Sequence, residues 1–314
     1  MFRNESGGGA RSGLLVVGVV AAAAALLAGC AGDGAGSGDD AGKDAAAQAG
    51  LTPEATSSPS TADGKPVDGK PADGKGADPL ATVTRSAAKP LAGKVVVLDP
   101  GHNIGNAAHT AEINRLVDVG NAHKECDTTG TETNAGYPEA KYTLDMSHRV
   151  RDLLVARGAT VKLTYDGDRP YGPCVDERAR IGNEAHADAA LSIHADGAPA
   201  ADRGFHVIAP KSMHVGKADT RKIAGPSYTL ATTLRAHFKA ATGEPFADYL
   251  GGGKGMTVRD DLGGLNLSLV SKVFIECGNM RNAQDAEELT DPAWRQHAAL
   301  GIADGLTAFL EGKR

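Results

Sequence analysis

Lys94-Val95-Val96-Val97-Leu98-Asp99-Pro100-Gly101-His102 is the stretch that decides the fold of this 314-residue chain. A short apolar run that ends in Asp-Pro-Gly predicts a buried strand leading into a turn. His102 follows at once, so an imidazole stands where the strand ends. A single histidine in that place is more often a hydrogen-bonded turn residue, and its meaning depends on the rest of the chain.

Strands and helices alternate after this point. Apolar runs predict further strands at 160–164, 189–193, 204–209 and 273–276, and helical periodicity predicts helices at 139–157, 176–187, 223–242 and 292–310. The alternation indicates an α/β fold: one domain, over residues 91–314, with a mostly parallel central sheet of about five to six strands and helices on both faces.

The N-terminal 30 residues predict an export signal. Arg3 and Arg11 accompany an apolar run at 14–27 that is shorter than a typical membrane span and ends in Leu-Ala-Gly-Cys30. This ending resembles the bacterial lipobox, which implies lipidation of Cys30 and anchoring at the outer face of the cytoplasmic membrane. The alternative is an ordinary signal peptide cleaved near the same place.

Residues 31–90 form a segment of Gly, Ala, Ser, Asp, Lys and Pro with almost no large apolar side chains. Such a composition buries too little apolar surface to offset the entropy lost on ordering, so we expect a disordered tether. Its expected role is to give an anchored domain reach beyond the membrane surface.

Charge and composition argue against nucleic acid as a partner. The net charge is −6 and aromatic residues make up 4% of the chain, which argues against nucleic-acid binding.

Three cysteines remain after Cys30. Cys126 and Cys174 lie in loop-like sequence, whereas Cys277 follows an apolar run that predicts the end of a buried strand. Because exported thiols meet an oxidising environment, the sequence favours a Cys126–Cys174 disulfide. The alternative is that two of the three thiols are unpaired and buried.

Four polar side chains occupy the places where an α/β sheet gathers its reactive groups. His102, His194 and Glu276 each end a predicted strand, and Glu139 opens a predicted helix. Two imidazoles and one carboxylate suit a catalytic zinc ion, which keeps a further position for water. A second carboxylate is needed to move the proton of that water, and Glu276 fits this role.

The residues around these four carry a resemblance. Leu98-Asp-Pro-Gly-His102, Glu139 at a helix start, Ala187-Asp-Ala-Ala-Leu-Ser-Ile-His-Ala195 and Ile275-Glu-Cys-Gly-Asn-Met-Arg-Asn282 together resemble the type-3 catalytic family of zinc-dependent N-acetylmuramoyl-L-alanine amidases, in an exported actinobacterial form. The resemblance covers about residues 94–310. It implies one Zn²⁺ per chain held by His102, Glu139 and His194, with Glu276 as catalytic acid/base. It also implies hydrolysis of the amide between N-acetylmuramic acid and L-alanine of peptidoglycan.

The chain departs from the family pattern at several places. Asn103 replaces a glycine after the histidine, Asp196 replaces an asparagine, and Cys277-Gly278 replaces a Gly-Phe pair. An insertion before Glu139 brings three further candidates for the third metal ligand: Glu112, Glu125 and Glu132. Glu139 is preferred because it leads directly into the amphipathic helix.

One further residue is a candidate for substrate binding. Arg259 lies where the family places a substrate-contacting loop, so it either holds a carboxylate of the stem peptide or is a solvated loop arginine.

Two other functions compete with the amidase. One is a different zinc peptidase acting on cell-wall peptides, which lacks support because no H-E-x-x-H motif occurs. The other is a non-catalytic lipoprotein that binds wall fragments on an amidase scaffold, although all four site residues are retained. The expected partners are peptidoglycan or muropeptides, and the membrane through Cys30; the expected state is a monomer.

Overall fold

The computed structural model describes residues 89–313. The predicted signal, Cys30 and all but the last two residues of the predicted tether lie outside the described residues. Within 89–313, no helix is both long and apolar enough to cross a membrane.

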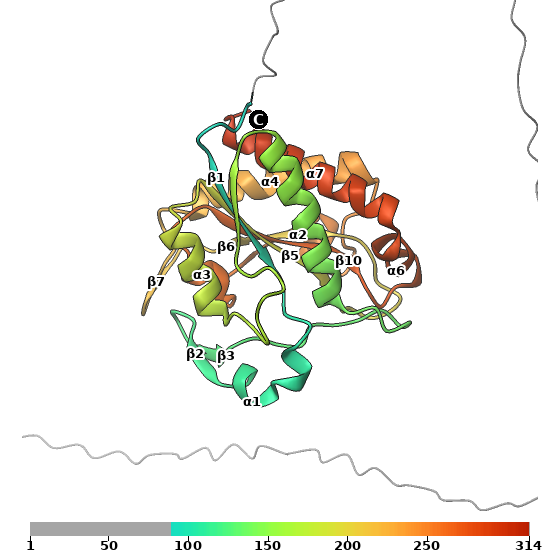
Figure 1. The fold of residues 1–314 in the computed structure, drawn as a ribbon, viewed down its shortest axis with the longest axis horizontal. Coiled ribbons are helices and arrows are strands. Elements are labelled where there is room, and N and C mark those ends of the chain that lie inside the picture. The colour runs from blue at the N-terminus through green and yellow to red at the C-terminus, as the bar shows by residue number, and fades with distance from the viewer. Residues whose placement is uncertain (1–88, 314) are drawn as a thin grey trace, which may run out of the picture. The chain divides into compact units, whose positions relative to one another are not determined.

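A six-stranded sheet forms the centre of the domain (Figure 1). Its order is β4 (Thr160–Leu163), β1 (Val95–Pro100), β5 (Ala189–Asp196), β10 (Lys272–Asn279), β6 (His206–Pro210) and β9 (Met256–Arg259). The first four strands are mutually parallel, and β6 and β9 are parallel to each other but run antiparallel to β10. The predicted fold class, an α/β domain with a mostly parallel sheet, is confirmed.

Alternation along the strands gives the sheet two different faces. On β5, Leu191 and Ile193 belong to the main core, whereas Ser192 and His194 point to the opposite face; on β10, Ile275 and Glu276 divide in the same way. Three long helices cover the core face: α2 (Glu139–Ala156), α4 (Ala224–Thr242) and α7 (Pro292–Leu310).

The second face carries smaller elements. They are α3 (Val175–Glu184), α5 (Gly263–Asn266) and the hairpin of β2 (Leu116–Asp118) and β3 (His123–Glu125). The face of the sheet that carries the polar side chains is therefore covered by shorter elements than the apolar face. These polar side chains gather at the edge where β1, β5 and β10 end.

Several short elements do not appear in the sequence prediction. They are the 3₁₀ turns 106–108 and 251–253, α1 (Thr110–Ile113), α5, α6 (Ala283–Thr290), the edge strand β9, the β2–β3 hairpin, and the hairpin of β7 (His214–Val215) and β8 (Ala218–Asp219). The boundaries of the long elements agree closely with the prediction. The helix predicted to end before Gly243 does so, because Gly243 takes up the left-handed conformation (φ 72°).

Candidate active site

Three of the predicted site residues come together at the carboxyl edge of the sheet. His102 lies in the turn after β1, Glu139 is the first residue of α2, and His194 lies on β5. Their ligand atoms all lie within 4.8 Å of one another. Glu139 stands between the two imidazoles: its Oε2 is 3.2 Å from His102 Nε2, and its Oε1 is 3.0 Å from His194 Nδ1.

The turn that carries His102 has an unusual backbone. His102 adopts a left-handed conformation with φ 59°, which a non-glycine residue rarely takes. Gly101 before it packs directly against the His194 ring, because a Cβ at this position would lie 2.3 Å from His194 Cε1. The Gly-His pair therefore brings one imidazole into place and leaves room for the other.

Glu139 is held rigidly at the start of α2. Its side chain is buried, and its two oxygens accept hydrogen bonds from the backbone N–H groups of Thr131 (3.0 Å) and Ala195 (3.2 Å). Burial alone would raise the pKa of this carboxyl, but His102 and His194 outweigh burial and lower it. Glu139 therefore carries a negative charge at the centre of the group.

The hydrogen bonds of the two rings decide which nitrogens face the centre. His102 Nδ1 donates to the Thr128 carbonyl oxygen at 3.1 Å, so Nε2 is the nitrogen that faces Glu139. Ser192 Oγ donates to Asp99 at 2.8 Å and lies 3.3 Å from His194 Nε2, so it accepts a hydrogen bond from that nitrogen. His194 Nδ1 is the nitrogen that faces Glu139.

This arrangement fits a divalent cation. Two imidazole lone pairs and one carboxylate converge, which is unfavourable unless positive charge lies among them. Burial lowers the pKa of His102, but Glu139 and Asp127 more than offset it and raise that pKa to about 10. The site therefore attracts positive charge, and two histidines with one carboxylate form a typical ligand set for catalytic zinc.

Glu112, Glu125 and Glu132 do not join this group. Among the described residues, Glu139 is the carboxylate that lies within 4.8 Å of both His102 and His194. Glu112 instead pairs with His109 at 3.4 Å.

Glu276 lies beside this group on the neighbouring strand. It is the direct register partner of His194 across β10 and β5, and both side chains point to the thinly covered face. Burial and the negative charges of Glu139 and Asp196 raise the pKa of Glu276 well above its usual value. Glu276 is therefore a carboxyl group able to hold a proton, close to the converging ligands.

Two hollows flank the ligand group. One cavity, of about 270 Å³, adjoins both imidazoles. Its other lining residues come from the β2–β3 hairpin, α3, β10 and the segment at α5; they include Lys124, Asp127, Val175, Asp261, Leu262 and Phe274. A second hollow, of about 420 Å³, includes Gly130, whose position is in contact with His102 and Glu139. Both hollows therefore adjoin the ligand group.

Arg259 lies on β9, separated from β10 by β6. Its side chain is exposed and forms a double hydrogen bond with Asp261, at 2.8 and 2.7 Å. Asp261 lines the 270 Å³ cavity, and Arg259, its hydrogen-bond partner, therefore lies at the rim of that cavity.

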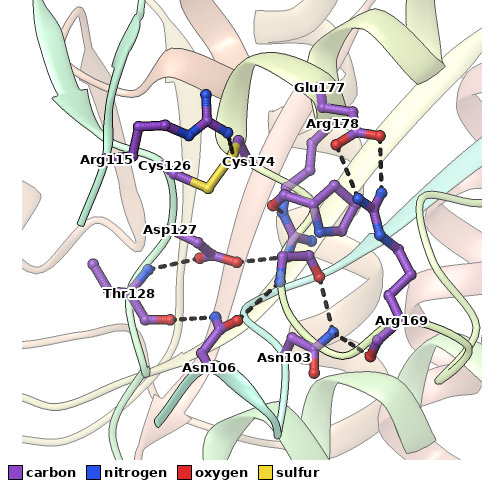
Figure 2. The surroundings of a disulfide bond; sticks show 12 residues. Asn103, Asn106, Arg115, Cys126, Asp127, Thr128, Arg169, Cys174, Glu177 and Arg178 are labelled. Carbon is purple, nitrogen blue, oxygen red and sulfur yellow. Dashed lines mark hydrogen bonds and ion pairs between the residues drawn. A yellow bond between two sulfur atoms is a disulfide. The ribbon is translucent and has the colours of Figure 1, made fainter. Parts of the chain in front are cut away.

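The predicted disulfide between Cys126 and Cys174 is present and is buried (Figure 2). Cys277 is a buried free thiol. It lies within β10 rather than at its end, because that strand continues to Asn279.

Four residues close to the site were not singled out from the sequence. Asp99 and Arg178 are buried, Asp127 lies behind His102 with its Oδ1 3.6 Å from Nδ1, and His206 is the register partner of Glu276 on β6. Two of them carried a local signal: Asp99 belongs to the Asp-Pro-Gly-His motif, and Asp127 follows a cysteine that the prediction paired.

Comparisons with known proteins point to one family. The family model described as N-acetylmuramoyl-L-alanine amidase matches residues 96–308. The chain is 39% identical over 233 residues to N-acetylmuramoyl-L-alanine amidase Rv3717 of Mycobacterium tuberculosis, covering 73% of this chain and 92% of that protein.

Solved structures agree with this similarity. The crystal structure of the N-acetylmuramyl-L-alanine amidase Ami1 from Mycobacterium smegmatis superposes with a TM-score of 0.65 at 41% identity, covering 71% of this chain and 99% of that one. The catalytic domain of CwlV from Bacillus (Paenibacillus) polymyxa var. colistinus gives 0.52 at 22% identity over 70% and 99% of the two chains, which supports the fold alone.

Proposed function

The chain belongs to the N-acetylmuramoyl-L-alanine amidase family and hydrolyses the amide between N-acetylmuramic acid and L-alanine of peptidoglycan; we propose that it does so as a zinc enzyme. In this proposal His102 Nε2, Glu139 and His194 Nδ1 hold one zinc ion, and Glu276 is the catalytic acid/base. The observation that carries it is the Glu139 carboxylate, 3.2 Å from His102 Nε2 and 3.0 Å from His194 Nδ1.

The zinc ion and the protein each supply part of the chemistry of amide hydrolysis. Zinc, when bound, polarises the scissile carbonyl and lowers the pKa of a water molecule towards neutrality. Glu276 accepts the proton of the attacking water and passes it to the nitrogen of the departing L-alanine. Because His194 and Glu276 are paired on adjacent strands, the carboxyl stays beside the reacting carbonyl during both transfers.

The two hollows suit the two sides of the scissile bond. The amide joins a sugar to a peptide, so the substrate continues in both directions from the reacting carbon. We expect the glycan and the stem peptide to occupy opposite hollows. Arg259, at the rim, is proposed to bind a carboxylate of the stem peptide.

The protein acts at the cell wall, as its amidase relatives indicate. We propose in addition that Cys30 is lipidated, that residues 31–90 tether the monomeric catalytic domain to the membrane, and that the chain is exported by the signal at 1–30. The support is the sequence Leu27-Ala-Gly-Cys30 after an apolar run, and the composition of the segment that follows.

Metal analysis together with product identification tests the zinc proposal. Purified wild-type protein should hold one zinc per chain and release stem peptides with a free L-alanine amine from muropeptides. His102→Ala should lose both the metal and the activity, whereas His109→Ala, a nearby histidine outside the ligand group, should keep both. Full activity in metal-free wild-type protein would refute the proposal.

A further inference from the structure

A single buried arginine on α3, Arg178, donates hydrogen bonds to two carboxylates that lie near the proposed histidine ligands. Arg178 Nη1 donates to Asp99 Oδ1 at 2.9 Å, and its Nη2 donates to Asp127 Oδ2 at 2.9 Å. Both carboxylates are buried, and each stands behind one imidazole. Neither belongs to the ligand group itself.

The first branch leads to His102. Asp127 Oδ1 lies 3.6 Å from His102 Nδ1, and the next residue, Thr128, accepts a hydrogen bond from that nitrogen through its carbonyl oxygen. Arg178 also donates to the carbonyl oxygen of His102 at 3.0 Å. The arginine therefore holds both the backbone of His102 and the carboxylate behind its ring.

The second branch leads to His194. Asp99 Oδ2 accepts a hydrogen bond from Ser192 Oγ at 2.8 Å, and Ser192 Oγ is 3.3 Å from His194 Nε2. Lys272 and Thr164 hold the same carboxylate, at 2.9 and 2.8 Å. The orientation of this ring therefore depends on a chain of two hydrogen bonds that begins at Asp99.

The disulfide fixes the geometry of the first branch. Cys126 precedes Asp127, and Cys174 immediately precedes α3, which carries Arg178 one turn later (Figure 2). Val175 N–H donates to the Cys126 carbonyl oxygen at 2.7 Å beside the covalent bond. The crosslink and the Arg178–Asp127 pair thus join the same two segments.

We propose that Arg178 is a positioning residue for the metal centre, which aligns His102 through Asp127 and His194 through Asp99 and Ser192. The proposal rests on the zinc-binding function proposed above. Partners that hydrogen-bond the remote nitrogens of ligand histidines orient the rings and strengthen metal binding. The planar fork of arginine is suited to join two such partners, because a lysine ammonium lacks its fixed spacing of donors.

Zinc affinity of the full chain, measured with zinc and a competing chelator, is the first test. Arg178→Lys, Asp127→Asn and Ser192→Ala should each bind zinc about 10- to 100-fold more weakly than wild type. Arg295→Lys is the matched control, because Arg295 also holds a carboxylate, that of Asp145, and donates to the backbone carbonyl oxygens of Leu289 and Thr290, outside the ligand group. Its zinc affinity should stay within about twofold of wild type.

Side-chain NMR of the histidines in the zinc-loaded protein separates positioning from simple stabilisation. Asp127→Asn should shift the imidazole signals of His102 and Ser192→Ala those of His194, whereas Arg178→Lys should shift both sets. Folded variants with wild-type zinc affinity and unmoved imidazole signals would overturn the inference. If Arg178→Lys fails to fold, the other two variants decide it. Wild-type protein that binds no zinc would instead refute the proposed function.

Discussion

Glu276 and His194 are direct register partners on the parallel strands β10 and β5, and their side chains project from the same face of the sheet. One belongs to the converging ligand group and the other stands next to it. The sheet itself therefore sets the spacing between a proposed metal ligand and the proposed acid/base, without any help from loops.

Replacing Glu276 should separate metal binding from catalysis. Glu276→Gln removes the group that exchanges protons but touches none of the three ligands, so zinc content should be unchanged while kcat falls by about 10²- to 10⁴-fold. The measurement is release of stem peptides from purified muropeptides. Glu112→Gln, an exposed carboxyl that pairs with His109 outside the ligand group, is the control. A Glu276 variant with normal turnover would remove this residue from the mechanism.

Gly101→Ala should displace His194. The added methyl group would lie 2.3 to 2.6 Å from three ring atoms, so the ring must move, and overpacking of this kind costs about 1–3 kcal/mol of stability. We expect zinc affinity to fall about tenfold or more. Gly225→Ala on α4, where a Cβ meets open space, should leave zinc binding unchanged. Equal zinc affinity in the two variants would contradict the close approach described here.

Arg259→Ala should raise KM more than it lowers kcat. Losing a charge-assisted hydrogen bond to a stem-peptide carboxylate corresponds to about a tenfold or larger rise in KM. Arg221 offers a matched control, since it forms the same double hydrogen bond with Asp219, at 2.7 Å for both contacts, away from the ligand group. If both alanine variants have wild-type KM, Arg259 is an ordinary surface arginine.

The unfolding free energy should decrease as the pH rises from about 5 to about 9. Burial, a hydrogen bond with Glu288 and the charge of Asp285 raise the pKa of Glu244 to about 9. Between the ordinary value of 4.5 and that value the folded state binds a proton that the unfolded state has lost, so stability is lost as pH increases.

Glu244→Gln should flatten this dependence, which is at most about 1.4 kcal/mol per pH unit for one proton. Urea unfolding at pH 5, 7 and 9 measures it. Glu287→Gln, an exposed neighbour on α6, should keep the wild-type slope. Identical slopes in wild type and Glu244→Gln would exclude Glu244 as the source.

Cys30→Ala should release the protein from the membrane fraction if Cys30 carries the proposed lipid. Two acyl chains suffice for stable anchoring, whereas the described domain has no membrane-spanning helix. Mass spectrometry of the mature N-terminus gives the direct answer. An unmodified N-terminal residue in the membrane-bound protein would rule out lipidation.

The main elements were predictable because their patterns are strong. The apolar run before Asp99 predicts a strand, which is β1, and the amphipathic periodicity that ends at Gly158 predicts a helix, which is α2. β9 was missed because it is a four-residue, partly exposed edge strand, and the β2–β3 hairpin because its strands are short and polar.

The buried residues that hold the proposed ligand histidines in place could not be predicted from the sequence. An arginine within a short helix usually points to solvent, and nothing near Arg178 indicates that it is buried against two carboxylates. No motif marks His206 either, and its pairing with Glu276 follows only from β6 lying antiparallel to β10. Such relationships arise from strand order, which local patterns do not specify.

The crosslink between Cys126 and Cys174 also orders the events of maturation. Thiols remain reduced in the bacterial cytosol and oxidise outside it, so a newly made chain leaves the ribosome with the Asp127 segment and α3 joined only by noncovalent contacts. With the export proposed above, the covalent link closes outside the cytosol, in the compartment that holds the peptidoglycan. The crosslink beside the proposed metal centre would then form only where the substrate is.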